Sequence, residues 1–188
     1  MSTQDISAKG GAKESPGLGN AALRARARGL KLMAFDVDGV MTDGSLYYGP
    51  DGEAFKVFNS LDGHGLKQLS QAGVVLAIIT GRNSDMVARR AADLGITHVI
   101  QGREDKGIVL QALAESLKLA PHQVGYAGDD EPDVPALILA HLAFSVPNGH
   151  HSAQQHADII TRQPGGQGAV REICDFILSA LPAERSST

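Results

Sequence analysis

The sequence predicts one α/β domain built on a doubly wound, Rossmann-like parallel sheet with a small hairpin insertion. From Leu30 onward, short apolar runs alternate with segments of helical periodicity. The apolar runs are nearly continuous, as in parallel strands that are covered on both faces. Alternation of such strands with helices implies right-handed crossovers, and the 188 residues suit one domain with a small insertion.

The expected elements follow one another from residue 21. Basic residues 21–28 favour a short helix, and the turn sequence Gly49-Pro50-Asp51-Gly52 favours a hairpin within 45–58. The remaining expected strands are 30–37, 74–80, 97–102, 124–128, 142–146 and a short 157–161, and the expected helices are 61–73, 84–95, 105–118, 133–141 and 168–180. Residues 1–25, rich in small and polar types, are expected to form a disordered tail, 26–182 the domain and 183–188 a flexible end.

Composition narrows the function classes. The net charge of −4 provides no basic surface for nucleic acid. No apolar run approaches the roughly 20 residues that cross a bilayer, and the N-terminus lacks an apolar signal core. The single cysteine, Cys174, lies in an amphipathic segment and is expected to be a buried thiol. We therefore expect a cytoplasmic protein with no nucleic acid or membrane partner.

Polar residues follow four of the expected strands. In open parallel sheets, ligands bind beyond the carboxyl ends of the strands, so these residues are expected to meet at one edge. They are Asp36 and Asp38 after the first strand, Thr80, Gly81 and Arg82 after the second, Lys106 at the start of the helix after the third, and Asp129 and Asp130, with Asp133 three residues on, after the fourth.

This set predicts phosphoryl transfer. Converging carboxylates repel one another unless a hard cation lies between them, and Mg²⁺ held by Asp36, Asp129 and the Asp38 carbonyl suits a phosphate ligand. Asp36 can attack phosphorus to form an aspartyl phosphate, while Thr80 and Lys106 hold the phosphoryl oxygens. Asp38 can protonate the leaving alcohol and then activate water.

Simpler interpretations exist for each residue alone. Asp129 and Asp130 could cap the next helix, Thr80 could cap a turn, and Lys106 could be a solvated helix residue. Asp133, with Asp130, is assigned to a supporting role that holds ligands or lysine in place. The histidines, including His150, His151 and His156, show no metal-ligand spacing.

The chain from about Leu30 to Leu178 resembles the haloacid dehalogenase-like phosphatases. Within them it is similar to the 3-deoxy-D-manno-octulosonate 8-phosphate phosphatases of bacterial lipopolysaccharide synthesis. The resemblance lies in FDVDGVMTDG, FNSLDGHGLK, IITGR, EDK, GDDEPDVP and GGQGAVREICD. It implies a haloacid dehalogenase-like fold without a large cap domain.

The resemblance also implies roles for individual residues. Asp36 would be nucleophile and Mg²⁺ ligand, Asp38 the acid/base with its carbonyl on the metal, and Asp129 the remaining ligand. Thr80 and Lys106 would hold the phosphoryl group. The sugar acid would be bound by Asp38, Asn59, Ser60, Leu61, Asp62, Gly63, Lys67, Arg82, Arg90 and Lys106.

Two departures from the family are visible. Some members have arginine where this chain has Leu61, so one carboxylate contact would be absent or supplied by another residue, and the long N-terminal tail lies outside the shared motifs. The resemblance implies a homotetramer with sites at subunit interfaces. Association of four hairpins near 45–58 would remove their exposed edges, and the segment with Gly165, Gly166 and Gly168 could reach an adjacent site.

Three alternatives remain at this point. A related phosphatase could act on another sugar phosphate, such as sialic acid 9-phosphate. A non-catalytic oligomerisation module, like domains linked to cytidylyltransferases, is expected to lose Asp36, Asp38 or Lys106, and this chain has all three. A receiver domain also combines acidic residues, a threonine and a lysine, but the order Asp36-Val37-Asp38-Gly39 argues against it.

Overall fold

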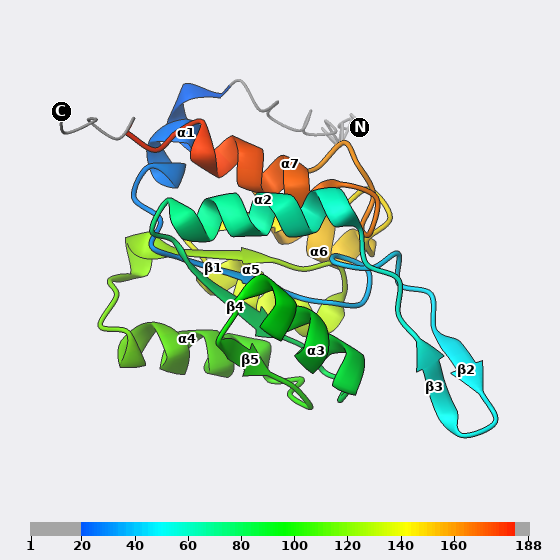
Figure 1. Ribbon diagram of the computed structural model, residues 1–188. Helices are drawn as coiled ribbons and strands as arrows, with labels where there is room; N and C mark the ends of the chain where they lie inside the picture. The colour runs from blue at the N-terminus through cyan, green and yellow to red at the C-terminus, as the bar shows by residue number, and fades with distance from the viewer. Residues whose placement is uncertain (1–19, 183–188) are drawn as a thin grey trace, which may run out of the picture.

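The structure, a computed structural model, describes residues 20–182 and is organised around one parallel sheet (Figure 1). The strand order is β5-β4-β1-β6-β7-β8, and each neighbouring pair runs parallel. This confirms the predicted sheet. Its strands are β1 (Leu32–Phe35), β4 (Val75–Ile79), β5 (His98–Ile100), β6 (Val124–Ala127), β7 (Leu142–Ser145) and β8 (Ile159–Ile160).

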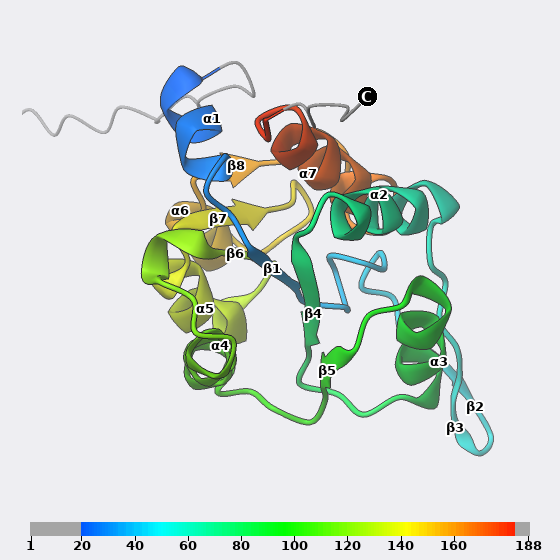
Figure 2. The ribbon, with the colours of Figure 1, turned by 60° about the vertical axis from the view of Figure 1, so that its left-hand side comes forward.

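Helices cover both faces of the sheet, as the apolar strands require (Figure 2). Along β1, Met33 and Phe35 join one core cluster while Leu32 and Ala34 join the other. The first cluster packs beneath α1 (Ala21–Ala27), α2 (Ser60–Gln71), α3 (Asp85–Leu94) and α7 (Ala169–Leu178). The second packs beneath α4 (Lys106–Ser116), α5 (Val134–Leu139) and α6 (His151–His156). Two 3₁₀ turns, η1 (Pro121–Gln123) and η2 (Glu131–Asp133), flank β6.

Helices α2 and α3 show how local chemistry sets helix ends, and the start of α3 also bears on the site. The Asn59 side chain accepts a hydrogen bond at the start of α2, and Gly95 ends α3 in the left-handed conformation. Ser84 occupies the N-cap position of α3, as expected for Ser84 or Asn83, but its side chain makes no cap hydrogen bond. Its hydroxyl donates to Glu53 instead, 31 residues earlier in the chain.

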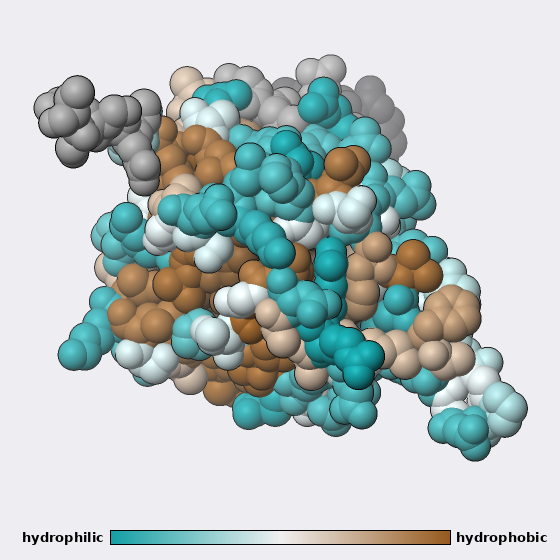
Figure 3. All heavy atoms as spheres, viewed as in Figure 1, coloured by the Kyte–Doolittle hydropathy of each residue, from teal (hydrophilic) through white to brown (hydrophobic). Residues whose placement is uncertain are grey.

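The predicted hairpin consists of β2 (Tyr47–Gly49) and β3 (Gly52–Phe55), which pair antiparallel and project from the body of the domain (Figure 1). Tyr47 stacks on Phe55 with ring centroids 4.5 Å apart. Large apolar side chains are nevertheless exposed on the hairpin and its flanks, and Figure 3 shows hydrophobic side chains where it leaves the body. They are Leu46, Tyr48, Phe55 and Val57.

Helix α1 confirms the short helix expected at residues 21–28, although its first residues also fell within the expected tail of 1–25. Residues 1–19 and 183–188 lie outside the described residues. Helix α6 was not predicted, because its polar residues bury only Ala153. His151 and His156 lie on that short helix, and His150 caps it.

Cys174 lies on the buried side of α7, as predicted, and burial raises the pKa of its thiol. None of the helices within residues 20–182 has the length and apolar content to cross a bilayer.

Candidate active site

The residues predicted from the four strand ends meet at the carboxyl edge of the sheet. Asp36 directly follows β1, and its backbone N–H still donates to Ala127 of β6 at 2.9 Å. Thr80 directly follows β4 and bonds in the same way to Ile100 of β5 at 3.0 Å. Because these residues extend the sheet by one hydrogen bond, their side chains are held by rigid elements.

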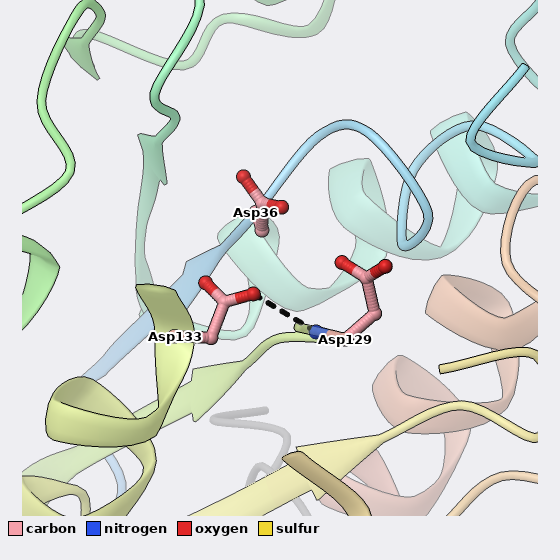
Figure 4. Close-up of side chains that lie close together, drawn as sticks. All are labelled: Asp36, Asp129 and Asp133. Atoms are coloured by element: carbon pink, nitrogen blue, oxygen red, sulfur yellow. Dashed lines mark hydrogen bonds between the residues drawn. The ribbon is translucent and has the colours of Figure 1, made fainter. Parts of the chain in front are cut away.

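Three carboxylates converge at this edge. Asp36, Asp129 and Asp133 each offer an oxygen, and these oxygens all lie within 4.8 Å of one another. Figure 4 shows the three side chains close together, at the ends of β1 and β6 and on η2. Asp36 is 5% exposed and Asp133 is fully buried. Three ionised carboxylates so close would repel strongly, so a cation nearby favours their ionised form.

Asp133 is already fully hydrogen-bonded. Its Oδ1 accepts from Lys106 Nζ at 2.7 Å and from the Tyr126 hydroxyl at 2.6 Å. Its Oδ2 accepts from the backbone N–H groups of Asp129 at 3.0 Å and Asp130 at 3.1 Å. Four donors on two oxygens leave Asp133 no capacity for a metal. In this structure Asp133 therefore holds Lys106 and the loop after β6, and its supporting role stays a prediction.

In the part of the chain that the structure describes, Asp36, Asp38 and Asp129 each have a carboxylate oxygen without a hydrogen bond. Within residues 20–182, Asp36 Oδ1, Asp38 Oδ2 and Asp129 Oδ1 are buried without a hydrogen-bond partner. Lys106 Nζ does lie 2.9 Å from Asp36 Oδ1, in an ion pair whose angles are not those of a hydrogen bond. Buried unpartnered carboxylate oxygens are costly. A hard divalent cation between Asp36 and Asp129 would satisfy the oxygens of these two residues, so the donor set fits Mg²⁺.

The pKa values reflect the same crowding. Burial, together with the charge of Asp133, raises the pKa of Asp36 to about 7 in spite of the nearby Lys106. Burial and the charges of Asp36 and Asp133 raise the pKa of Asp129 to about 8. Without a cation, these groups hold protons at a pH where ordinary aspartates are ionised.

Two glycines make room for the carboxylates. Gly39 has φ +97°, and a Cβ there would lie 2.0 Å from Asp129 Oδ2. A Cβ on Gly128 would lie 2.4 Å from the Cβ of Asp133. Both distances are below any contact between real side chains, so Asp129 and Asp133 reach their positions because these two residues are glycine.

Lys106 occupies the first position of α4, where its side chain is only 4% exposed. Burial alone would lower its pKa, but the charges of Asp36 and Asp133 raise it above the usual value. The group is thus a fixed positive charge beside Asp36. The hydroxyl of Thr80, also buried, makes no hydrogen bond within residues 20–182 and is free for a ligand.

Asp38 lies beside the hairpin. Its Oδ1 accepts a short hydrogen bond from Lys56 Nζ, and Arg82 Nε lies 3.7 Å from its Oδ2. Arg82 also donates to the Tyr48 hydroxyl at 2.8 Å, and its guanidinium lies over the Tyr48 ring. The structure therefore brings Arg82 to the site and ties it to β2.

Some of the expected sugar-binding residues are fixed by hydrogen bonds or packing, and others are exposed on α2. Asn59 caps α2 and donates to Gly166 at 3.3 Å, and Arg90 donates to the Asn59 carbonyl at 3.2 Å. Gly63 leaves room for Arg90, because a Cβ there would lie 2.3 Å from Arg90 Nη2. Asp62 is different: it is buried, and its carboxylate accepts from the Arg171 N–H at 2.8 Å at the start of α7, as a structural cap does.

Three further members are exposed. Ser60 and Lys67 lie on the outer surface of α2, and Leu61 is 57% exposed. The Asp130 side chain is 61% exposed and accepts from Glu131 N–H at 2.8 Å. Its backbone N–H donates to Asp133 Oδ2 at 3.1 Å, within a capping box that joins the two residues, and the supporting role of Asp130 stays a prediction.

Sequence reasoning missed several residues that shape the site. Tyr126 was hidden in an apolar strand, although a tyrosine hydroxyl inside a buried run usually needs a partner. Glu53 and Lys56 were interpreted only as hairpin residues; their opposite charges three residues apart were the available signal. Asn148 bridges two loops, donating to the Gly39 carbonyl at 3.3 Å and accepting from Gly165 N–H at 2.8 Å.

Two grooves include residues of the expected sugar-binding set. One of about 340 Å³ is lined by Lys56, Phe58, Asp85, Met86, Arg89, Arg90 and Asp93. Another of about 690 Å³ is lined mainly by α7 and the segment before it, together with Arg24 and Leu61, and includes none of the clustered carboxylates. The smaller groove is the one that shares a residue, Lys56, with the contacts of Asp38.

Comparisons with known proteins agree with this architecture. Residues 50–141 match the family of haloacid dehalogenase-like hydrolases. The chain is 44% identical over 156 residues to the 3-deoxy-D-manno-octulosonate 8-phosphate phosphatase KdsC of Escherichia coli K12, with 83% of each chain covered. The homologue from Yersinia pestis is also 44% identical, over 155 residues, covering 82% of this chain and 83% of that protein.

Solved structures agree as well. That of the Moraxella catarrhalis 3-deoxy-D-manno-octulosonate 8-phosphate phosphatase, in complex with magnesium, phosphate and KDO, is similar with a TM-score of 0.83 and 46% identity, covering 85% of this chain and 92% of that one. The cobalt-bound enzyme from Haemophilus influenzae has a TM-score of 0.80 and 37% identity, covering 82% and 91%. With its fold, its strand-end motifs and these relatives together, the chain belongs to the 3-deoxy-D-manno-octulosonate 8-phosphate phosphatase family of haloacid dehalogenase-like phosphatases.

Proposed function

We propose that this phosphatase hydrolyses 3-deoxy-D-manno-octulosonate 8-phosphate with Mg²⁺ and Asp36 as nucleophile. The observation that carries the mechanism is the position of Asp36, buried at the end of β1 between Lys106 at 2.9 Å and the unpartnered oxygen of Asp129. The substrate is supported by family membership and by the KDO named in the Moraxella catarrhalis structure.

In this proposal Mg²⁺ would be held by the carboxylates of Asp36 and Asp129 and by the backbone carbonyl of Asp38. The magnesium and cobalt named in the two similar structures support a divalent ion in this family. When bound, the ion neutralises charge on the carboxylates and on the phosphoryl oxygens.

The nucleophilic step uses groups that are already in place. A carboxylate oxygen of Asp36 attacks phosphorus, the bond from phosphorus to the sugar oxygen breaks, and an aspartyl phosphate forms. Lys106 and the free Thr80 hydroxyl hold the phosphoryl oxygens as charge develops on them. Asp133 fixes Lys106 in its place, since Lys106 Nζ lies 2.7 Å from Asp133 Oδ1.

Asp38 acts as the general acid and then as the general base. In the first step its carboxyl donates a proton to the departing sugar oxygen. In the second step its carboxylate takes a proton from water as the water oxygen attacks the aspartyl phosphate, which releases inorganic phosphate and restores Asp36. The position of Asp38 two residues after Asp36 in FDVDG places both on one loop at the end of β1.

Two arginines, one beside Asp38 and one hydrogen-bonded to the start of α2, would recognise the sugar acid. Arg82 and Arg90 suit a substrate with a carboxylate and a phosphate, because guanidinium groups bind such oxygens in pairs. Asn59, Ser60, Leu61, Asp62, Gly63 and Lys67 complete the set that the family resemblance implies. Within that set, we infer that Asp62 acts through its bond to α7 rather than by touching the sugar.

We further propose a homotetramer that works in lipopolysaccharide precursor synthesis in the cytoplasm. The exposed Tyr48 and Phe55, 63% and 52% accessible, support association through the hairpin. Burying four such hairpins together would also cover their unpaired edges.

A substrate panel tests the function. Purified protein with Mg²⁺ is expected to release phosphate from the octulosonate 8-phosphate far faster than from sialic acid 9-phosphate or 4-nitrophenyl phosphate. Equal rates on all three would overturn the substrate assignment but leave the phosphatase chemistry intact. Light scattering tests the tetramer separately, with Tyr48→Ser/Phe55→Ser as the variant expected to give smaller species.

A further inference from the structure

Lys56 connects the hairpin to Asp38 through a buried ammonium group. The residue follows β3, yet its side chain is only 2% exposed. Its Nζ donates a short hydrogen bond to Asp38 Oδ1 and lies 2.9 Å from Glu53 Oε1. A lysine so deeply buried is unusual on a projecting hairpin and needs both carboxylates as partners.

Glu53 is itself held from a second element. Its Oε2 accepts a hydrogen bond from Ser84 Oγ at 2.5 Å, and Arg82 Nη2 lies 3.9 Å from its Oε1. Ser84 thereby gives up the cap hydrogen bond that its position at the start of α3 would favour. The contacts Asp38–Lys56, Lys56–Glu53 and Glu53–Ser84 thus connect the loop after β1, the hairpin and α3.

The contact with Lys56 distinguishes the two oxygens of Asp38. An ammonium group can only donate hydrogen bonds, so the oxygen that faces it must accept. Oδ1 is therefore engaged as an acceptor by Lys56, which favours Oδ2 as the oxygen that faces the substrate. Oδ2 is buried and makes no hydrogen bond within residues 20–182, with Arg82 Nε 3.7 Å away, so it is the oxygen left to exchange a proton with the substrate.

We propose that Lys56, supported by Glu53, is a positioning residue that orients the Asp38 carboxyl so that Oδ2 exchanges the proton with the substrate. The proposal rests on the acid/base role of Asp38 in the proposed function. As the Asp36–phosphorus bond forms and the bond to the sugar oxygen breaks, the proton on Oδ2 passes to that oxygen. In the hydrolytic step, Oδ2 takes a proton from the attacking water.

The test uses the dependence of kcat/KM on the leaving group. This constant reports steps up to formation of the aspartyl phosphate, and a positioned proton donor matters most when the departing alkoxide is basic. In Lys56→Met, kcat/KM for the octulosonate 8-phosphate should fall about 10- to 100-fold, while that for 4-nitrophenyl phosphate falls less than about threefold. A series of substituted phenyl phosphates should show a steeper dependence than in the wild type.

Four further variants make the outcome decisive. Lys56→Arg retains a donor and should restore the wild-type dependence, and Glu53→Gln should show a weaker form of the Lys56→Met effect. Lys56→Met/Glu53→Gln removes one charge of each sign, which separates orientation from local charge. The matched control is Lys31→Met, which replaces an exposed lysine directly before β1, at the end of the strand away from the site. It is expected to leave kcat/KM and its leaving-group dependence unchanged.

Equal losses for good and poor leaving groups in Lys56→Met, with melting temperature unchanged, would show a structural role and overturn the proposal. If Lys56→Met does not fold, Glu53→Gln and Lys56→Arg decide by the same readout. Asp38→Asn separates this proposal from the function beneath it. Should Asp38→Asn lack the selective loss, the acid role of Asp38 is wrong; should it show the loss while the Lys56 and Glu53 variants do not, only the positioning role is wrong.

Discussion

Lys106 and Asp133 form an ion pair that is buried at both ends: Nζ lies 2.7 Å from Oδ1, and the side chains are 4% and 1% exposed. The pair joins the start of α4 to η2, 27 residues apart in sequence. Since Lys106 also faces Asp36, the geometry of the nucleophile depends on a residue that has no free oxygen for substrate or metal.

Replacement of Asp133 by alanine is expected to destabilise the fold strongly. The change removes the acceptor for the Tyr126 hydroxyl and two backbone N–H groups and leaves Lys106 with Asp36 alone. Breaking a buried pair costs about 3–5 kcal/mol, which urea unfolding would measure. The control is Asp175→Ala, whose half-exposed pair with Arg171 should contribute less than about 1 kcal/mol. Similar losses for the two variants would contradict the structural role of Asp133.

Replacement of Asp36 by asparagine should abolish turnover without unfolding the protein. The amide keeps the shape of the side chain but cannot form an acyl phosphate, so kcat is expected to fall by at least about 10⁴-fold. In chelator at about pH 8.5, the melting temperature should not fall, because the variant removes one of the carboxylates that repel one another. Substantial remaining activity would rule out the covalent mechanism.

The stability of the metal-free protein should decrease as pH rises. The folded-state pKa values of Asp36 and Asp129, about 7 and about 8, lie above the ordinary 3.8. The folded state therefore binds more protons than the unfolded state between these values, and its stability is lost as pH rises through the window. Melting temperatures in chelator at several pH values would test this. Asp36→Asn/Asp129→Asn should remove most of the dependence.

Magnesium should stabilise the protein more at high pH than at low pH. A cation binds the ionised carboxylates and competes with the protons that the raised pKa values retain. The increase in melting temperature with Mg²⁺ is therefore expected to be larger at about pH 8.5 than at about pH 6. An increase of the same size at both values would argue against Asp36 and Asp129 as ligands.

Replacement of Gly39 by alanine should weaken Mg²⁺ binding by displacing Asp129. A Cβ at this position would lie 2.0 Å from Asp129 Oδ2, and the residue also has a positive φ. Gly73→Ala is the matched control, because Gly73 has φ +83° but a Cβ there would meet no atom within 4 Å. Both variants should lose about 1 kcal/mol of stability from backbone strain. Only Gly39→Ala should lower the Mg²⁺ affinity measured by calorimetry.

The positions of the strand-end residues were predictable because a parallel sheet sends every strand end to the same edge. Asp36, Thr80 and Asp129 follow β1, β4 and β6 as the apolar runs indicated. The use of the Asp133 oxygens was not predictable in detail. Its partners Lys106 and Tyr126 come from different elements, and only the folded chain shows that they share one oxygen.

The link from the hairpin to Asp38 was beyond the reach of the sequence for a related reason. In the sequence, Lys56 and Glu53 resemble ordinary charged residues on a solvent-facing hairpin. The alternation of polar and apolar residues along the strand does not show that Asp38, in the loop after β1, lies opposite Lys56. The cap of α3 is a second example. Ser84 is the residue that propensity selects, and the competing bond to Glu53 appears only when the hairpin is in place.

The hydrogen bonds of Asp133 also constrain the length of GDDEPD. One carboxylate oxygen closes a ring with the N–H groups of residues 129 and 130, while the other reaches across to α4. An insertion or deletion between Asp129 and Asp133 could not satisfy both ends, whatever residues it contained. The four-residue spacing from Asp129 to Asp133 is therefore set by the distances that the Asp133 carboxylate must span. A homologous sequence with a different spacing would be expected to hold the lysine equivalent to Lys106 through another residue.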